Sequence, residues 1–148
     1  PSTLRTSNLS GISMSQQIIH SDRAPKAIGP YSQAVRVGDT LYLSGQTPLD
    51  PASGELVAGD ISAQARQVFE NLKAVLAAAD ASFDMVARVG IYLTDLGNFS
   101  AVNEVMKQYF HEPYPARSTI GVAALPRGAQ VEIDMIAVFA GRARASLG

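Results

Sequence analysis

The spacing of apolar residues along the chain predicts two amphipathic helices. In residues 61–79 they recur every three or four positions, as on one face of an α-helix, and Asp60 before them is a typical N-cap. The pattern returns in residues 99–110, where Asn98 is expected to cap the helix and Pro113 to prevent its continuation. The stripe expected to be buried on this second helix comprises Phe99, Val102, Met106, Tyr109 and Phe110. We expect the first helix to lie on a sheet through its apolar face, and its opposite, polar face to be solvated.

Alternating and β-branched apolar residues predict about six strands around these helices. The expected strands are a short one at 18–20, a hairpin at 33–37 and 40–44, one at 85–94, and two at 116–125 and 130–140. A turn at Pro126, Arg127 and Gly128 joins the last two, which predicts an antiparallel pair. Residues 45–59 are rich in Gly and Pro and are expected to form a long loop, of the kind that is commonly functional in small domains.

The order of these elements, β, ββ, α, β, α, ββ, is that of a single α/β (α+β) domain, and 148 residues is the length of one domain. Two helices can cover only one face of such a sheet. The last strand is apolar on both sides after Asp134, so the uncovered face is expected to be buried against a partner. The pattern therefore predicts an oligomer.

The composition argues against several classes of function. The chain has no Cys and two distant histidines, His20 and His111, so neither a disulfide framework nor a thiolate or His-rich metal site is expected. A net charge of −1, with Lys and Arg scattered, gives no broad basic surface for nucleic acid. No stretch reaches the roughly 18 consecutive apolar residues that span a bilayer, so a soluble cytoplasmic protein without a membrane partner is expected.

The first thirteen residues are rich in Ser and Thr, contain no acidic residue and precede Met14, which we interpret as a natural start. They lack the apolar run, about 7 to 15 residues long, of a secretory signal. A vector-derived segment, a different start site and a short organellar presequence all stay open, and the last of these would place the protein in an organelle. The chain is therefore divided into an extension at 1–13, a domain at 14–141 and a tail at 142–148.

Two charged side chains lie on the strands predicted near the C-terminus. Arg117 has only small and apolar neighbours, and Glu132 lies between two apolar residues. Opposite charges on adjacent strands can form a structural ion pair, and that interpretation stays open. The alternative is an anion site, because a guanidinium offers a planar fork of donors that matches a carboxylate and a nearby glutamate can move protons.

The residues around these charges belong to a series of motifs. They read P-A-R-S at 115–118, A-A-L-P at 123–126 and V-E-I at 131–133. Upstream motifs are A-P-K-A-I-G-P-Y-S-Q-A-V at 24–35, L-Y-L-S-G-Q-T-P-L-D-P-A-S-G-E-L-V at 41–57 and A-Q-A-R-Q-V-F-E-N-L-K-A-V-L-A-A-A at 63–79. In this order they resemble the Rid family of enamine/imine deaminases, also known as the YjgF family, and within it the RidA-like subgroup. The resemblance covers nearly all of residues 17–140.

The resemblance implies a chorismate-mutase-like fold and a homotrimer whose sheets line a central barrel, with three sites in the clefts between subunits. It also implies hydrolysis of 2-imino and 2-enamino acids, such as 2-iminopropanoate and 2-iminobutanoate, to 2-keto acids and ammonia. Pyridoxal-phosphate dehydratases make such imines from Ser or Thr, so the implied role is the pre-emption of metabolite damage. No cofactor is required for this hydrolysis.

The resemblance also assigns residues to the site. Arg117 is implied as the anchor of the substrate carboxylate, and Glu132 as the acid or base. The positions expected to line the pocket are Tyr31, Ser44, Gly45, Asn103 and Thr119. Many family members carry Cys where this chain has Thr119, so a thiol-based role is removed and a hydroxyl that can hydrogen-bond is kept. Without the resemblance, plain structural roles are the favoured explanation of the first four positions: loop packing for Tyr31, a local backbone hydrogen bond for Ser44, a turn for Gly45 and an exposed helix position for Asn103.

Two other functions stay open on the sequence. A protein that binds or senses a keto or imino acid would use the same Arg117 fork without turnover. A ribonuclease or translation inhibitor, which the resemblance to perchloric-acid-soluble relatives suggests, fits the charge balance poorly. A dehydratase-coupled assay separates an enzyme from a sensor, because only an enzyme accelerates the release of keto acid.

Overall fold

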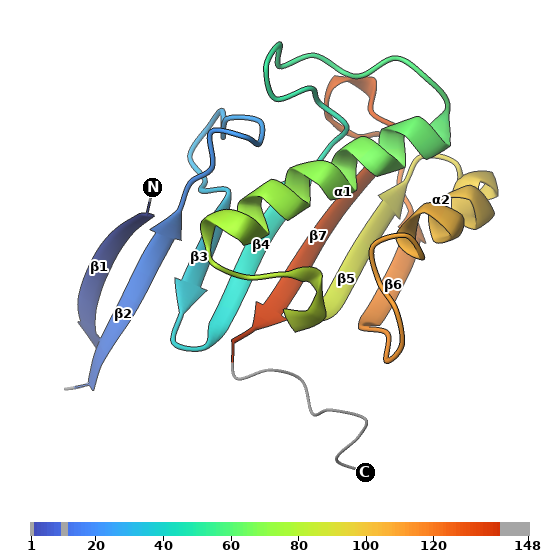
Figure 1. Ribbon diagram of the computed structural model, residues 1–148. Coiled ribbons are helices and arrows are strands. Elements are labelled where there is room, and N and C mark those ends of the chain that lie inside the picture. Colours follow the sequence, from blue (N-terminus) through green and yellow to red (C-terminus); the bar gives the residue numbers. More distant parts are fainter. Residues whose placement is uncertain (1, 10–11, 140–148) are drawn as a thin grey trace.

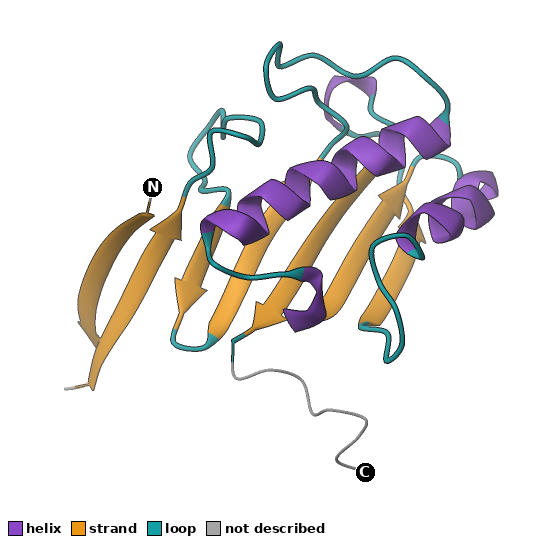
Figure 2. Ribbon diagram, viewed as in Figure 1, coloured by secondary structure: helices purple, strands orange, loops and turns teal. Residues whose placement is uncertain are grey.

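The computed structural model describes residues 2–9 and 12–139, which form one sheet with both helices on the same face (Figures 1 and 2). Its seven strands pair in the order β1-β2-β3-β4-β7-β5-β6. All neighbours are antiparallel except β5 and β6, which are parallel. The strands are β1 (Ser2–Leu9), β2 (Ile12–Ile19), β3 (Ala34–Val37), β4 (Thr40–Gln46), β5 (Val86–Leu93), β6 (Ala116–Gly121) and β7 (Val131–Val138), and the helices are α1 (Ile61–Ala78) and α2 (Phe99–Met106).

The predicted α/β class, with two helices on one face of a mixed sheet, is confirmed, and β1 adds a seventh strand to the six expected. The first helix begins where the sequence indicates. Asp60 Oδ1 accepts a hydrogen bond from the backbone N–H of Ala63 at 2.9 Å, which satisfies one of the free donors of the first helical turn. The buried apolar face of α1 consists of Ala65, Val68, Phe69, Leu72, Val75 and Leu76.

β7 separates the two faces of the sheet residue by residue, because successive side chains of a strand point to opposite sides. One set is buried on the side of the helices and consists of Val131, Ile133, Met135 and Ala137. The alternate set is only half-buried and consists of Glu132, Asp134, Ile136 and Val138. We call the side of this second set the open face. The cross-strand register adds Tyr42 of β4, Arg88 and Tyr92 of β5, and Ile120 of β6 to it.

The predicted hairpin between the last two strands is wrong, because β5 lies between β6 and β7. β6 pairs in parallel with β5, since α2 carries the chain back across the sheet between them, as parallel neighbours require. β6 also ends at Gly121, so residues 122–130 form the connection to β7. As a result Arg117 and Glu132 lie on strands that are not neighbours, and an ion pair between adjacent strands is not possible.

The start and end of α2 differ from the prediction. Asn98 occupies the N-cap position but makes no capping hydrogen bond with its side chain. A short 3-10 turn, Leu96–Asn98, leads directly into the helix, and the Asp95 side chain caps that turn by accepting from Gly97 N. The helix ends at Met106, well before Pro113, and Phe99 is 38% exposed instead of buried.

The N-terminal part of the sheet is longer than predicted. β2 begins at Ile12 instead of residue 18 and pairs along its full length with β1, which lies in the segment expected to be an extension. The strand predicted at 130–140 is β7, ending at Val138. Its predicted last residue, Ala140, and the tail at 142–148 lie outside the described residues.

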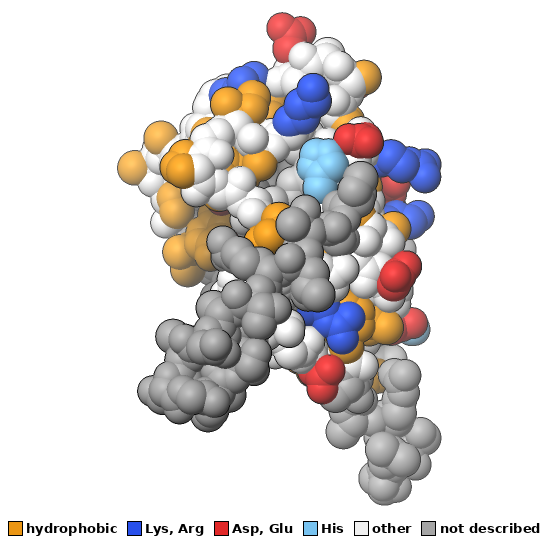
Figure 3. All heavy atoms as spheres, turned by 90° about the vertical axis from the view of Figure 1, so that its left-hand side faces the viewer, with side chains coloured by type: hydrophobic (Ala, Val, Ile, Leu, Met, Phe, Trp, Pro, Cys, Tyr) orange, Lys and Arg blue, Asp and Glu red, His pale blue; other side chains and the backbone are white. Residues whose placement is uncertain are grey.

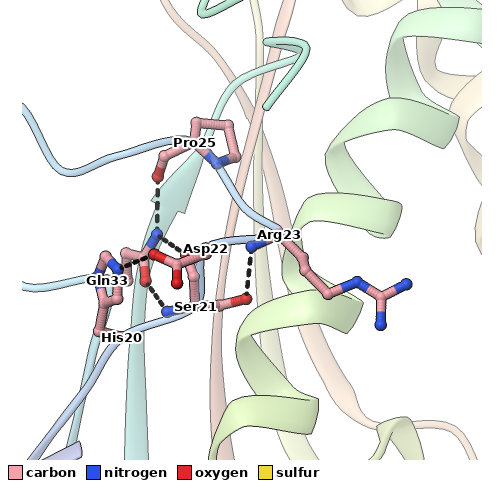
Figure 4. A network of polar contacts seen from close by, with 6 residues as sticks. All are labelled: His20, Ser21, Asp22, Arg23, Pro25 and Gln33. Atoms are coloured by element: carbon pink, nitrogen blue, oxygen red, sulfur yellow. Dashed lines mark hydrogen bonds and ion pairs between the residues drawn. The ribbon is translucent and has the colours of Figure 1, made fainter. Parts of the chain in front are cut away.

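The loop between β2 and β3 is held in place by one buried amide (Figure 4). Gln33 Oε1 accepts from the backbone N–H of Ser21 at 2.6 Å. Its Nε2 donates to the carbonyl oxygens of Ser21 at 3.1 Å and Pro25 at 2.8 Å. A single side chain thereby satisfies three buried backbone groups and fixes the start of the loop that carries Tyr31.

The distribution of charged side chains on the surface agrees with the net charge of −1 (Figure 3). On the face drawn in Figure 3, acidic and basic side chains are interspersed and no large patch of one sign is seen. Within residues 2–9 and 12–139, no helix has the length and apolarity that a membrane crossing needs.

We predict that Phe69→Ala destabilises the fold far more than Phe99→Ala. The Phe69 ring is fully buried, stacks on Tyr109 at 5.0 Å between centroids and contacts Phe83 and Phe110 edge-on. Removing such a ring costs about 3–5 kcal/mol, whereas the half-exposed Phe99 should cost about 1 kcal/mol or less. Urea unfolding at one fixed protein concentration measures both, and equal costs would contradict this description of the core.

Candidate active site

Arg117 lies on β6, at the edge of the sheet, and its guanidinium reaches under α2. Nη1 donates to Asn103 Oδ1 at 2.5 Å and lies 3.7 Å from Met106 Sδ. The guanidinium carbon is 5.2 Å from the centre of the Phe99 ring, within the range of a cation–π contact. These contacts occupy one end of the fork, so the other nitrogen donors of the guanidinium remain available for a ligand.

A groove of about 520 Å³ opens beside this guanidinium. It is lined by Ser100, Asn103, Glu104, Met106, Lys107, Tyr114, Pro115 and Arg117. Its size lies within the range of small-molecule sites, which is roughly 300–1,000 Å³. Asn103 and Arg117, which the sequence motifs assign to the same pocket, are therefore brought together by the fold.

Thr119 lies two residues after Arg117 on the same side of β6, since both pair with residues of β5 that face the helices. Its hydroxyl is buried and has no hydrogen-bond partner among the residues that the structure describes. Burying an unpaired hydroxyl costs free energy, so an available polar group on the same face of β6 as Arg117 points to a ligand atom or a water molecule. Arg117, Asn103 and Thr119 form what we call the arginine half-site.

Glu132 lies on the open face of β7, against Gly45 of β4. A Cβ built on Gly45 would lie 2.9 Å from the Glu132 Cδ and would collide with Oε2. Burial raises the pKa of the Glu132 carboxyl above its ordinary value, and the negative charge of Asp134 raises it further. A carboxyl whose pKa is raised toward neutral pH is suited to proton transfer. Glu132 and Gly45 form what we call the glutamate half-site.

Ser44 and Tyr31 are less directly tied to these groups. Ser44 Oγ donates to the carbonyl oxygen of Ser32 at 2.6 Å, and its backbone N–H donates to the carbonyl oxygen of Gln33. The local backbone role considered for Ser44 is therefore present, and its hydroxyl oxygen can still accept a hydrogen bond. Tyr31 is 53% exposed on the loop that Gln33 anchors, with room around its ring for a partner.

The two half-sites do not meet within one chain. Arg117 is on the helix side of β6, whereas Glu132 is on the open face of β7, and β5 lies between the two strands. A ligand of a few atoms cannot contact both groups through the sheet. One chain therefore presents the two halves of the predicted site at different surfaces.

A second groove, of about 550 Å³, lies between residues 20–23 and α1 and contains none of the predicted site residues. Its two carboxylates are engaged elsewhere: Asp22 pairs with His20 at 2.8 Å, and Glu70 accepts from the Tyr109 hydroxyl at 2.7 Å. We place the candidate chemistry at the half-sites, because they offer a guanidinium with available donors and a carboxyl whose pKa is raised.

Four contacts of the half-sites were not assigned from the sequence. Met106 and Phe99 were placed in the buried stripe of the second helix, but both contact Arg117. Their helical spacing with Asn103 is the signal that could have identified them. Asp134 and Tyr92 lie beside Glu132 on the open face. The signal that could have identified Asp134 is its spacing in V-E-I-D, which places both acids on the same side of a strand.

Comparisons with known proteins point to one family. The family model described as Endoribonuclease L-PSP matches residues 21–139. A Myxococcus xanthus protein named DfrA is 61% identical over 84% of this chain and 97% of its own length. A Capra hircus protein named 2-iminobutanoate/2-iminopropanoate deaminase is 49% identical over 91% of this chain and 98% of its own length. The crystal structure of RidA from an Antarctic Psychrobacter species matches with a TM-score of 0.80 and 51% identity, covering 82% of this chain and 98% of that one.

We predict that Gly45→Ala displaces the Glu132 carboxyl and lowers its pKa toward the ordinary value. The added Cβ occupies the space of the carboxyl group, which must move into water, where burial no longer disfavours its charge. The pH titration of isotope-labelled glutamate carboxyl carbons by NMR measures the shift. Gly121→Ala is the matched control, because its Cβ would meet only the exposed Leu96 side chain. An unchanged Glu132 titration in Gly45→Ala would contradict the prediction.

Proposed function

This chain belongs to the Rid (YjgF) family, described as Endoribonuclease L-PSP, and we propose that it hydrolyses 2-imino and 2-enamino acids to 2-keto acids and ammonia. The observation that carries the proposal is its similarity, over most of its length, to a protein named 2-iminobutanoate/2-iminopropanoate deaminase. The half-sites supply the two functions that this reaction needs, which are an anchor for a carboxylate and a group that moves protons.

Arg117 holds the substrate carboxylate in this proposal. Asn103 and Met106 contact Nη1 and thereby orient the planar fork, while the remaining donors are available to a ligand bound in the groove that Arg117 lines. Hydrogen bonds between charged groups contribute on the order of 1.5–3 kcal/mol each where water is excluded. Two such bonds suffice to orient a substrate of only a few heavy atoms.

Glu132 moves the protons. An enamine first takes a proton at C3 while its nitrogen gives one up, which converts its C=C–NH2 unit to HC–C=NH. The oxygen of a water molecule then adds to C2, the C=N electron pair moves to nitrogen, and Glu132 transfers a proton from that oxygen to the nitrogen, which gives a carbinolamine. Glu132 then transfers the remaining proton of the hydroxyl to the nitrogen as the C–N bond breaks and C=O forms, so imine and water give keto acid and ammonia. The balance needs neither an oxidant nor a cofactor.

We propose further that the complete site forms between copies of the chain in a homotrimer. The open face carries apolar side chains, including Ile136, Val138 and the half-exposed Ile120, that no element of the same chain covers within the described residues. Burying such a face against a second copy is favourable at about 25 cal/mol per Å² of apolar area. A second copy would also bring a glutamate half-site to the arginine half-site, which one chain keeps apart.

The family description suggests a ribonuclease as a second candidate. Its substrate would be a polyanion, and phosphate contacts by Lys and Arg dominate the affinity of such interfaces. The net charge of −1 and the interspersed charges of Figure 3 give little support for that binding mode. The deaminase assignment also fits the proposed supply of substrate, since dehydratases that use pyridoxal phosphate release imines of Ser and Thr.

We predict that Arg117→Lys lowers kcat/KM for imine hydrolysis by about 10- to 100-fold for each charge-assisted bond that is lost, because an ammonium group cannot replace a bidentate fork. The assay couples a dehydratase acting on Thr or Ser to detection of the keto acid. Arg66→Lys, on the exposed side of α1, is the matched control and should keep full activity. If Arg117→Lys were as active as Arg66→Lys, the guanidinium would have no part in the reaction.

We predict that Val138→Asp gives a folded protein that neither assembles nor turns over substrate, whereas Phe139→Asp loses stability. Val138 lies on the open face, but Phe139 packs against the core with the Arg36 guanidinium 3.6 Å from its ring centre. An unpaired buried charge costs several kcal/mol in either place. Sedimentation, circular dichroism and the coupled assay measure assembly, folding and turnover. A folded monomer of Val138→Asp with full activity would exclude the intersubunit site, and a monomeric wild type would exclude the trimer.

A further inference from the structure

Asp134 stands beside Glu132 on the open face. The two carboxyl-bearing residues are two positions apart on β7, so their Cα atoms are separated by roughly 6.6 Å along the strand and their side chains point the same way. The charge of Asp134 acts on Glu132 and is the main charge that disfavours its ionisation. Neither the sequence motifs nor the reaction described above gives Asp134 a role.

Tyr92 fixes the Asp134 carboxylate. Tyr92 is on β5, directly opposite Glu132 in the cross-strand register, and its hydroxyl donates diagonally to Asp134 Oδ2 at 3.0 Å. Burial, followed by this hydrogen bond, raises the pKa of the Tyr92 hydroxyl above its ordinary value, so it remains a donor at all physiological pH values. The carboxylate is therefore held beside Glu132 instead of rotating into solvent.

Two glycines make room for the two carboxyl groups. Gly90 of β5 pairs directly with Asp134, and a Cβ on it would collide with Asp134 Oδ1 and lie 3.0 Å from the Tyr92 hydroxyl. Gly45 of β4 leaves the corresponding space for Glu132 on the other side of β7. Each carboxyl group therefore packs against a glycine of a different neighbouring strand. A side chain at Gly45 or Gly90 would occupy the space of the Glu132 or Asp134 carboxyl group.

From this arrangement we propose that Asp134 is a positioning residue for the reaction: held by Tyr92, its carboxylate sets the pH range in which Glu132 exchanges its proton. This inference rests on the proposed function of Glu132. The physical basis is repulsion between like charges at a site that is partly shielded from water, where the Asp134 carboxylate makes the ionisation of Glu132 less favourable. Because the Tyr92 hydroxyl holds the Asp134 carboxylate in one position, the distance between the two carboxyl groups, and with it their repulsion, stays constant.

Several titratable groups lie on the same face as Glu132. Asp134 is on its own strand, Tyr92 and Arg88 are on β5, and Tyr42 is on β4. Arg88 would favour the ionised form of Glu132, but its guanidinium donates to Ser118 Oγ on β6 at 3.3 Å and is thereby drawn toward that strand. Tyr42 is not among the causes of the raised Glu132 pKa, which are burial and the charge of Asp134. Asp134 is therefore the group whose removal should change the proton affinity of Glu132.

The test uses the assembled protein and four variants. Asp134→Asn removes the charge and keeps an oxygen that Tyr92 can donate to, and Tyr92→Phe keeps the charge but releases it. Glu132→Gln identifies the limb of the pH profile of kcat/KM that belongs to Glu132, because that limb disappears. Asp80→Asn is the matched control, since Asp80 has a left-handed φ of 57° that Asn also tolerates and lies at the end of α1.

We expect the Glu132 limb to move to lower pH in Asp134→Asn, to move in the same direction but less far in Tyr92→Phe, and to stay in place in Asp80→Asn. A purely structural role of Asp134 would lower kcat/KM by the same factor at every pH, and that result would overturn the proposal. The proposal would also be overturned if Glu132→Gln left the profile unchanged. NMR titration of the Glu132 carboxyl in wild type and Asp134→Asn decides the same question without substrate, so an inactive wild type would refute the proposed function and not this inference.

Discussion

The alternation of side chains along β7 is the constraint on which the rest of the molecule depends. Its odd-numbered residues from Val131 to Ala137 form the floor on which α1 packs, and their burial commits the even-numbered residues to the other side. Glu132 can therefore not be turned toward α2 without exposing the core, because a shift of one residue would exchange the two faces. The division of the predicted site into two halves is a consequence of the same packing that stabilises the domain.

The open face combines two properties that are unfavourable in an isolated chain. It exposes apolar side chains such as Ile120, and it holds two acids close together. Both properties would become useful in the proposed assembly, because exclusion of water by a second copy would stabilise the apolar contacts and strengthen every electrostatic interaction within the cleft. Glycines at positions 45 and 90 are consistent with this interpretation, since they admit carboxyl groups where any other residue would fill the space.

Periodicity was sufficient to predict both helices, the long loop and most strands, because each depends on residues close in sequence. It failed where the outcome depends on distant partners. The pairing of β6 is set by the α2 crossover, and a local pattern of apolar residues contains no information about it. β1 was missed because its Ser- and Thr-rich sequence has too few apolar residues to show alternation. The motifs brought Arg117 and Asn103 together correctly, but the wrong hairpin hid the fact that Glu132 lies on the opposite face of the sheet.

A site divided between copies, as proposed, would give the reaction a physical safeguard. An arginine half-site on its own is solvated, and its guanidinium would bind any small carboxylate weakly, because water competes for each donor. The proposed proton transfer by Glu132 would need the opposite condition, a carboxyl whose pKa is raised by shielding from water and by a second negative charge. Assembly would satisfy both needs in one step, since the surface that covers the open face of one chain would also dry the groove beside Arg117 of another. In this arrangement catalytic competence follows from the burial of the open face, and the stability of the interface and the proton affinity of Glu132 are determined by the same contacts.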